Sequence, residues 1–254
     1  DAEALACVQK RIDDIMLGKA SIDYDALLMQ LDSKTGEYGD AGPQTLGFKG
    51  ETLAYRKVQH LELDDVFRSF MRKPIFRNIC RRMYGPIPIG VFRAMFFNKP
   101  AHLGTKLPWH QDRWTHLDRD PLVTIWTALD DATVANGCVE VIPGSHKRGV
   151  INPTHHSGFL TPEQVEQHCT DNVTPVELKA GEAFAMHNWL LHSSGVNSTA
   201  IPRRAFSVNY MDGRSKSSVA AEKIESGVLS DSTRAVIDEV FPIIFSDQDM
   251  AELL

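Results

Sequence analysis

The stretch "LPWHQDRWTHLDRDP" (residues 107–121) contains two His-x-Asp triplets, a pairing of residue types that can bind a metal. The first runs from His110 to Asp112 and the second from His116 to Asp118. If a triplet lies on a β-strand, its imidazole and carboxylate share one face and can bind one ion. A second histidine from a distant segment would complete the facial triad typical of non-haem Fe(II) oxygenases. With ten histidines in the chain, roughly one His-x-Asp triplet is expected by chance. The pattern alone therefore does not say which of the two triplets binds a metal.

A distant segment, residues 181–212, offers a third metal ligand and a candidate anion anchor. His192 ends a strand-like run, a polar loop follows, and Arg203 opens the next strand. A hairpin at this loop would place Arg203 beside His192, where its guanidinium could bind a carboxylate through two parallel hydrogen bonds. This context favours the first triplet as the metal site. We therefore expect His116 and Asp118 to form an exposed loop pair.

Two neighbouring residues compete for these roles. His187 lies five positions before His192, and on one continuous strand the two side chains would face opposite ways. Arg203 favours His192 as the ligand, which leaves His187 as a packed residue. Arg204 is the rival of Arg203 as the anion anchor. The strand from Arg203 onward has two distinct faces, since Arg203, Ala205, Ser207 and Asn209 alternate with Phe206, Val208 and Tyr210. The small and polar face suits a cavity, and the aromatic face should pack against outer helices.

The elements that would position these residues are helices first and short strands afterwards. The spacing in "ALACVQKRIDDIML" predicts a helix that Gly18 ends, and "LDDVFRSFMRKPIFRNICRRMYG" predicts two helical pieces broken near Pro74. Residues 33–52 read as a loop. The short runs "GVFRAMFF", "LVTIWTAL", "GCVEVIP" and "RRAFSVNYM" predict strands, and "TPEQVEQHC" predicts a short helix capped by Thr161. This order indicates a β-sandwich or barrel with helices outside it.

The chain resembles the phytanoyl-CoA dioxygenase (PhyH) family of Fe(II)/2-oxoglutarate-dependent oxygenases. The matching motifs run in family order from about residue 56 to 212: "RKVQHLELDDVF", "FFNKP", "WHQD", "IWTALDDATVANGCVEVIPGSHK" and "LLHSSGVNS…RR". The resemblance implies a mainly β fold with flanking helices, a double-stranded β-helix (jelly roll). We expect one domain over residues 1–254, with a mostly helical and loop flank at 1–85, a jelly-roll core at 86–213 and an extension at 214–254.

The resemblance also implies the cofactors and the residues that bind them. Fe(II) would be bound by His110, Asp112 and His192, and Arg203 would bind the far carboxylate of the cosubstrate 2-oxoglutarate. O2 would be the oxidant, and hydroxylation would release succinate and CO2. The family places further residues around the cosubstrate pocket, namely Lys57, Met95, Trp126 and Ser194. Relatives that halogenate have a small residue in place of Asp112, so the carboxylate favours hydroxylation; ring formation, desaturation or epimerisation in natural-product biosynthesis stay open.

The substrate is expected to be a small polar or anionic molecule. Arg93 lies two residues before Met95 on the same face of a predicted strand, and a charge pointing into a barrel needs a partner. That partner is either a nearby carboxylate of the protein or an anionic group of the substrate. Arg113 and Trp114 are further candidates for substrate contact. Two other classes remain as alternatives, a non-catalytic jelly-roll binding protein and a zinc hydrolase that uses the same three ligands.

The bulk properties exclude several partners. The net charge of −6 gives no basis for binding nucleic acid or an anionic membrane, which need clustered Lys and Arg. Four scattered cysteines argue against a disulfide framework and for a reducing compartment, so we expect a cytoplasmic protein. No apolar run approaches the roughly 18 residues that would span a bilayer. The sequence leaves the oligomeric state open.

Overall fold

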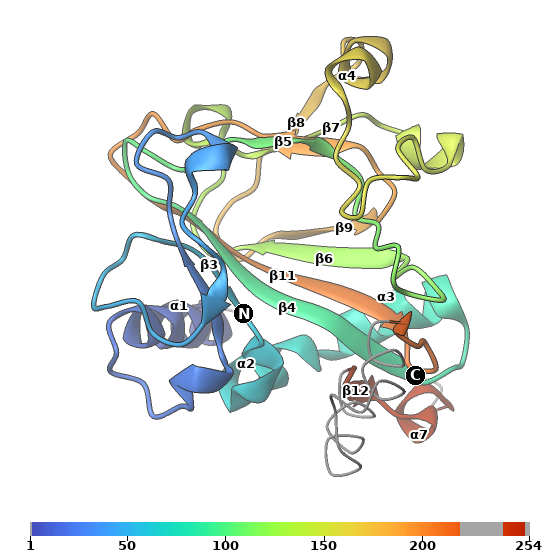
Figure 1. Cartoon of the computed structure of the whole chain (residues 1–254). Helices are drawn as coiled ribbons and strands as arrows, with labels where there is room; N and C mark the ends of the chain where they lie inside the picture. Colours follow the sequence, from blue (N-terminus) through green and yellow to red (C-terminus); the bar gives the residue numbers. More distant parts are fainter. Residues whose placement is uncertain (1, 219–240, 252–254) are drawn as a thin grey trace.

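Two antiparallel sheets face one another, and helices cover the outer face of the larger sheet (Figure 1). A computed structural model of the chain describes residues 2–218 and 241–251. The larger sheet has the order β2-β1-β3-β4-β11-β6-β9, with β12 paired to β4, and the smaller has the order β5-β10-β7-β8. The strands of the larger sheet are β1 (Leu28–Leu31), β2 (Thr45–Leu46), β3 (Tyr55–Gln59), β4 (Ile89–Lys99), β6 (Val123–Ala128), β9 (Ala183–His187), β11 (Arg203–Asp212) and β12 (Ile243–Phe245). Those of the smaller sheet are β5 (Leu107–His110), β7 (Val139–Val141), β8 (Thr174–Val176) and β10 (His192–Ser194).

The predicted helices are present with the boundaries that their capping residues dictate. They are α1 (Ala2–Met16), α2 (Asp65–Met71), α3 (Pro74–Tyr84) and α4 (Pro162–His168), and a short α7 (Asp247–Ala251) lies near the C-terminal end. Pro74 starts α3, where its missing N–H costs no hydrogen bond, and Gly85 ends that helix. The side chain of Thr161 caps α4 by accepting a hydrogen bond from the backbone of Gln164.

The main core lies between α1 to α3 and the outer face of the larger sheet. The aromatic face of β11 points here, as predicted: the ring of Phe206 lies 4.8 Å from that of Phe67 on α2. The hydroxyl of Tyr210 donates a hydrogen bond of 2.9 Å to the carbonyl of Met71. Because this face is filled by helices, the other face of β11 points into the space between the two sheets, where a ligand cavity can form (Figure 1).

The flanking regions contribute more strand than the sequence predicted. β1, β2 and β3 lie within residues 1–85 and extend the larger sheet beyond β4, so this flank is not only helix and loop. Likewise β12, from the C-terminal extension, pairs with the start of β4. These strands are two to five residues long, too short for alternation to identify them. The sequence "TRAVIDEVF" (residues 233–241) is compatible with a helix, but all of it except Phe241 lies outside the described residues. Among the helices described, none has the length and apolar character that crossing a bilayer requires.

Candidate active site

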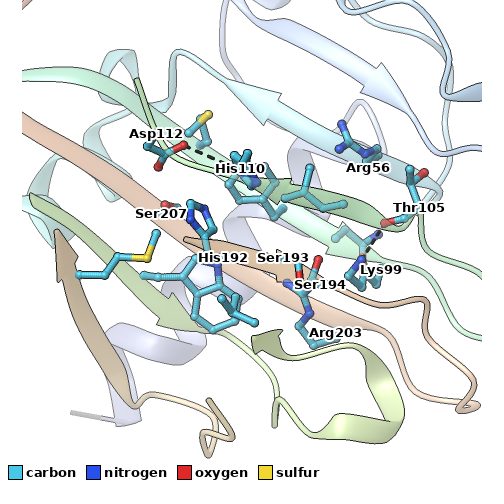
Figure 2. A pocket seen from close by; sticks show the side chains of 17 residues that line it. Arg56, Lys99, Thr105, His110, Asp112, His192, Ser193, Ser194, Arg203 and Ser207 are labelled. Carbon is cyan, nitrogen blue, oxygen red and sulfur yellow. Dashed lines mark hydrogen bonds and ion pairs between the residues drawn. The ribbon is translucent and has the colours of Figure 1, made fainter. Parts of the chain in front are cut away.

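The first His-x-Asp triplet and the distal histidine converge between the sheets. β5 ends at His110 and β10 begins at His192, and the two residues are direct partners in the register of the smaller sheet. With Asp112, just beyond β5, they offer three ligand atoms that all lie within 4.8 Å of one another. Figure 2 shows His110 and His192 side by side, with Asp112 directed toward them. Two imidazoles and a carboxylate in this arrangement can bind one divalent metal ion.

Backbone carbonyls orient both imidazole rings. Nδ1 of His110 lies 2.9 Å from the carbonyl oxygen of Pro108, and Nδ1 of His192 lies 2.9 Å from that of Leu190. Each contact requires a proton on Nδ1, which leaves the lone pair of Nε2 free for a metal. Nε2 of His110 faces Asp112, 3.8 Å from its Oδ1. Burial lowers the pKa of His110 well below its usual range, so its ring is neutral, as metal binding needs.

Gln111, the middle residue of the triplet, fixes the two ligands on either side of it. Its side chain is fully buried and donates hydrogen bonds to the carbonyls of Gly149 and Trp189, at 2.9 and 2.7 Å. Its Oε1 accepts a third, from the backbone of Ile151 at 2.7 Å. The backbone of Gln111 also packs on Gly158, where an added Cβ would lie 2.0 Å from the carbonyl oxygen of Gln111. The sequence analysis gave Gln111 no role.

Replacing Gln111 with alanine is expected to lower both stability and metal affinity. The change leaves two partly buried carbonyls and one partly buried N–H without this partner, which should cost about 1–3 kcal/mol of the free energy of unfolding. It also releases the segment that holds His110 and Asp112, so Fe(II) affinity should fall about tenfold or more. Urea unfolding and Fe(II) equilibrium dialysis measure the two effects. Unchanged Fe(II) affinity would show that the segment is held in place without this side chain.

Arg203 lies in the same cavity as the triad without a carboxylate of its own. It opens β11, is 3% exposed, and its guanidinium carbon lies 5.3 Å from the ring centre of Trp126. Nη2 donates to the carbonyl of Gly137 at 3.1 Å, and within the described chain the buried Nε has no hydrogen-bond partner. Burial lowers the pKa of Arg203 to about 10, which still leaves it charged at neutral pH. A buried, charged and under-bonded guanidinium is a site for an anion.

Arg204, the rival anchor, is committed to the protein itself. Its Nε and Nη2 donate to the two carboxylate oxygens of Asp130, each at 2.8 Å, and its Nη1 donates to Asp13 of α1 at 2.6 Å. These hydrogen bonds raise the pKa of Arg204. The two adjacent arginines therefore have different environments: Arg203 points into the cavity and Arg204 ties β11 to α1.

The cavity is also lined by two cations that were not predicted from the sequence, Lys99 and Arg56. Lys99 pairs with Arg203 across β4 and β11, is 4% exposed, and donates to the carbonyl of Thr105 at 2.7 Å. Burial and the charge of Arg203 lower the pKa of Lys99 well below its usual range. Arg56 donates to Gln30 at 2.7 Å. Figure 2 shows Arg56, Lys99 and Arg203 at the end of the cavity away from Asp112.

The strand geometry says which of these cations could have been predicted. Lys99 lies four residues after Met95 on β4, so simple alternation places both on the cavity face. Arg56 reaches the cavity through a β-bulge, since β1 residues Gln30 and Leu31 pair with Lys57 and Tyr55 and skip Arg56. A bulge of this kind changes the direction of one side chain, and the sequence of a short strand does not predict where it occurs.

Most residues predicted for the cosubstrate pocket line the cavity of the triad. Met95, Trp126 and Ser194 do so together with Arg203. Lys57 is not among the lining residues. Its Nζ lies 5.5 Å from the ring centre of Phe97, and Phe97 does line the cavity. Burial lowers the pKa of Lys57 to about 7, assisted by the charges of Arg56 and Arg93 and opposed by that of Asp112.

The predicted hairpin between His192 and Arg203 is wrong. β10 belongs to the smaller sheet and β11 to the larger, so the polar loop between them crosses from one sheet to the other. The two residues still meet because the sheets face each other across the cavity. β9 and β10 likewise lie in different sheets, so His187 and His192 are not on one strand. His187 stacks on His146 at 5.1 Å and stays outside the triad, as expected.

The second triplet and the predicted substrate residues have three different surroundings. The segment of His116 and Asp118 pairs with residues 216–218 near the surface. Nε of Arg113 lies 4.0 Å from Oδ2 of Asp120, so this arginine has an acidic neighbour. Trp114 is buried, and its ring packs beneath the guanidinium of Arg93 at 4.7 Å.

Asn209 lies on the cavity face of β11, and its side-chain amide donates a hydrogen bond of 3.4 Å to Asp112.

Comparisons with known proteins agree with this arrangement. The chain is 28% identical over 165 residues to "Phytanoyl-CoA dioxygenase" of Arabidopsis thaliana, covering 63% of this chain and 58% of that protein. It is 30% identical over 172 residues to "L-proline trans-4-hydroxylase" of Streptomyces griseoviridis, covering 59% of this chain and 64% of that protein. The alignments thus span about three-fifths of each relative's length.

Solved structures with the same architecture confirm the predicted jelly roll. The carbocyclase SnoK from nogalamycin biosynthesis, described as non-heme and alpha ketoglutarate dependent, superposes with a TM-score of 0.65 at 19% identity, covering 96% of this chain and 88% of that one. EctD from S. alaskensis, solved with 2-oxoglutarate and 5-hydroxyectoine, gives 0.61 at 18% identity, covering 83% and 68%. The match to the family model decides the family: with residues 1–205 of 254 matched, the chain belongs to the phytanoyl-CoA dioxygenase (PhyH) family.

Proposed function

We propose that the protein is a non-haem Fe(II)/2-oxoglutarate-dependent dioxygenase that hydroxylates a C–H bond of a small metabolite and releases succinate and CO2. The observation that carries the proposal is a two-histidine, one-carboxylate cluster in one cavity with a buried arginine that has an unpaired Nε. The donor set suits Fe(II). A zinc hydrolase could use the same cluster but has no need of the arginine. A non-catalytic binding protein would have no need of the metal ligands.

Three groups of residues would bind the metal, bind the cosubstrate and form the cavity wall. His110, Asp112 and His192 would hold Fe(II), which with O2 supplies the oxidising chemistry. Arg203 would bind the far carboxylate of 2-oxoglutarate through charge-assisted hydrogen bonds, and the indole of Trp126 keeps its guanidinium in place. Met95 and the ring of Trp126 provide an apolar wall, and the buried hydroxyl groups of Ser194 and Ser207 provide part of the polar wall.

Lys99 is proposed as a second cation for the same carboxylate. Two buried cations paired across neighbouring strands repel each other, and an anion between them removes that cost. Lys99→Met should therefore raise the KM for 2-oxoglutarate about tenfold. Lys106→Met is the matched control, because Lys106 lies on the same connection but is exposed. A KM that changes by less than twofold in Lys99→Met would limit this lysine to its bond with Thr105.

The relatives guide the choice of reaction and substrate. The name of L-proline trans-4-hydroxylase supports hydroxylation, and the presence of Asp112 in the triad supports it too. Ring formation, desaturation and epimerisation share the same cofactors and stay as alternatives. The partner is proposed to be a small molecule rather than nucleic acid or a membrane, and four free thiols support a cytoplasmic location.

The direct test is succinate release from 2-oxoglutarate across a panel of small metabolites, including amino acids. The proposal expects release that needs both Fe(II) and O2, and that one class of metabolite stimulates at least about tenfold. Product mass then separates hydroxylation, a gain of one oxygen, from desaturation. Turnover of a panel compound that persists under nitrogen with Zn(II) would favour the hydrolase instead.

A further inference from the structure

A second cavity, of about 640 Å³, adjoins the triad cavity along the same face of β3 and β4. Gln59, in its wall, pairs directly with Met95, in the wall of the triad cavity, so the walls of the two cavities lie next to each other on neighbouring strands. Its volume suits a small molecule. Arg93, which follows a β-bulge in β4, also lines it.

Arg93 contacts aromatic rings in this wall, and the charge of Asp112 acts on it only at a distance, which partly offsets the lowering of its pKa by burial. Its guanidinium carbon lies 4.8 Å from the ring centre of Phe92 and 4.7 Å from that of Trp114, and these two rings contact each other at 4.4 Å. The bulge in β4 skips Phe92 in the pairing with β11, which lets two successive side chains reach the same side. In the described part of the chain, no ion pair or hydrogen bond engages the guanidinium. The aromatic contacts orient the arginine and leave its N–H groups free.

The other ionisable groups of this cavity do not neutralise Arg93. Glu62 lines the same cavity, but no ion pair joins it to Arg93, and burial raises the pKa of its carboxyl group. Burial and the charge of Arg93 lower the pKa of His116, so that ring is neutral. His60 is engaged with the carbonyl of Ala26 at 2.8 Å. Arg93 is therefore the one arginine or lysine side chain among the described residues that line this cavity, and none of their carboxylates forms an ion pair with it.

We propose that this cavity is the substrate subsite and that Arg93 binds a carboxylate of the substrate. The inference rests on the proposed dioxygenase function and narrows its substrate to small carboxylic acids. Arg93 is two residues from Met95 on one strand, about 7 Å along it. The charge of Asp112, one of the three candidate metal ligands, also acts on Arg93. A carboxylate at Arg93 would therefore place a small substrate near the metal ligands. A guanidinium matches the two oxygens of a carboxylate with two parallel hydrogen bonds, whereas an amide has one acceptor oxygen and no charge.

The test compares acids with their uncharged amides on the Fe(II)-loaded protein under anaerobic conditions. The probes are pentanoate, phenylacetate and L-proline, each with its amide, titrated by calorimetry in saturating 2-oxoglutarate so that the Arg203 site is filled. At least one acid should bind ten times more tightly than its amide. Arg93→Met should abolish this preference, because methionine can pack against the rings of Phe92 and Trp114 but carries no charge. Arg93→Lys should retain part of it, and Arg119→Met, a control at a half-exposed arginine paired with Asp212, should retain all of it.

Three results would overturn the inference. They are that no acid is preferred over its amide, that the preference survives in Arg93→Met, or that Arg119→Met loses the preference as Arg93→Met does. The preceding titration with 2-oxoglutarate separates these failures from failure of the dioxygenase proposal. If 2-oxoglutarate binds wild type but not Arg203→Met, and no acid is preferred, only the substrate assignment fails. If 2-oxoglutarate does not bind at all, the cofactor proposal fails. The binding of each acid and its amide is then compared on the Fe(II)-loaded protein without 2-oxoglutarate, which still tests the role of Arg93.

Discussion

Replacing His192 with alanine is expected to abolish metal-dependent turnover. The imidazole supplies one of three ligand atoms that lie within 4.8 Å of one another, and no other histidine joins that cluster among the described residues. Loss of a residue that merely orients a ligand costs about 10–100-fold in metal affinity or activity, so loss of the ligand itself should cost about 10³-fold or more. Fe(II) equilibrium dialysis and succinate release measure the two consequences.

His187→Ala is the matched control for this experiment. His187 is a partly buried histidine five residues away, stacked on His146 and hydrogen bonded through Nδ1 to the backbone of Trp189 at 3.0 Å. Its removal should leave Fe(II) affinity within about twofold of wild type. If the two variants lost Fe(II) equally, the metal would not be held by the cluster described here. Thermal unfolding of each variant checks that both remain folded.

Replacing Arg203 with methionine should raise the KM for 2-oxoglutarate about 100-fold. The variant removes the buried positive charge that would form charge-assisted hydrogen bonds with the far carboxylate, worth about 1.5–3 kcal/mol each. Methionine occupies similar space against Trp126, so the cavity wall should persist. The effect is expected mainly in KM, because the carboxylate lies away from the reacting end. Initial succinate rates over a range of 2-oxoglutarate concentrations measure it.

Arg204→Met provides the contrast on the next residue. Its bonds to Asp130 and Asp13 join β11 to the segment after β6 and to α1, so its loss should lower the free energy of unfolding by about 1–3 kcal/mol. The KM for 2-oxoglutarate should stay within twofold. A result in which Arg204→Met raised the KM and Arg203→Met did not would reverse the assignment of the anchor.

The sequence predicted the parts of this site that follow strand alternation and capping. The cavity face of β11, with Arg203 and Ser207, followed from a period of two, and the limits of α3 followed from Pro74 and Gly85. Grouping of His110 with His192 came from family resemblance rather than from periodicity. Physical patterns of this kind describe one element at a time.

The features that were missed depend on contacts between elements. The change of sheet between β10 and β11 has no local signal, because a polar loop can equally close a hairpin. The bulge that brings Arg56 into the cavity arises from pairing with β1, a strand of four residues. Gln111 gains its role only when three distant backbone groups surround it. Each of these is a tertiary property, so a single sequence could not provide it.

The central claim is that one cavity holds both Fe(II) and 2-oxoglutarate, and anaerobic titration tests it most directly. Adding 2-oxoglutarate to the Fe(II)-loaded protein should produce a weak visible charge-transfer band that saturates at one equivalent. The same titration should give no band in His192→Ala and a much weaker response in Arg203→Met. A wild-type protein that stays colourless at saturating Fe(II) and 2-oxoglutarate would contradict the account.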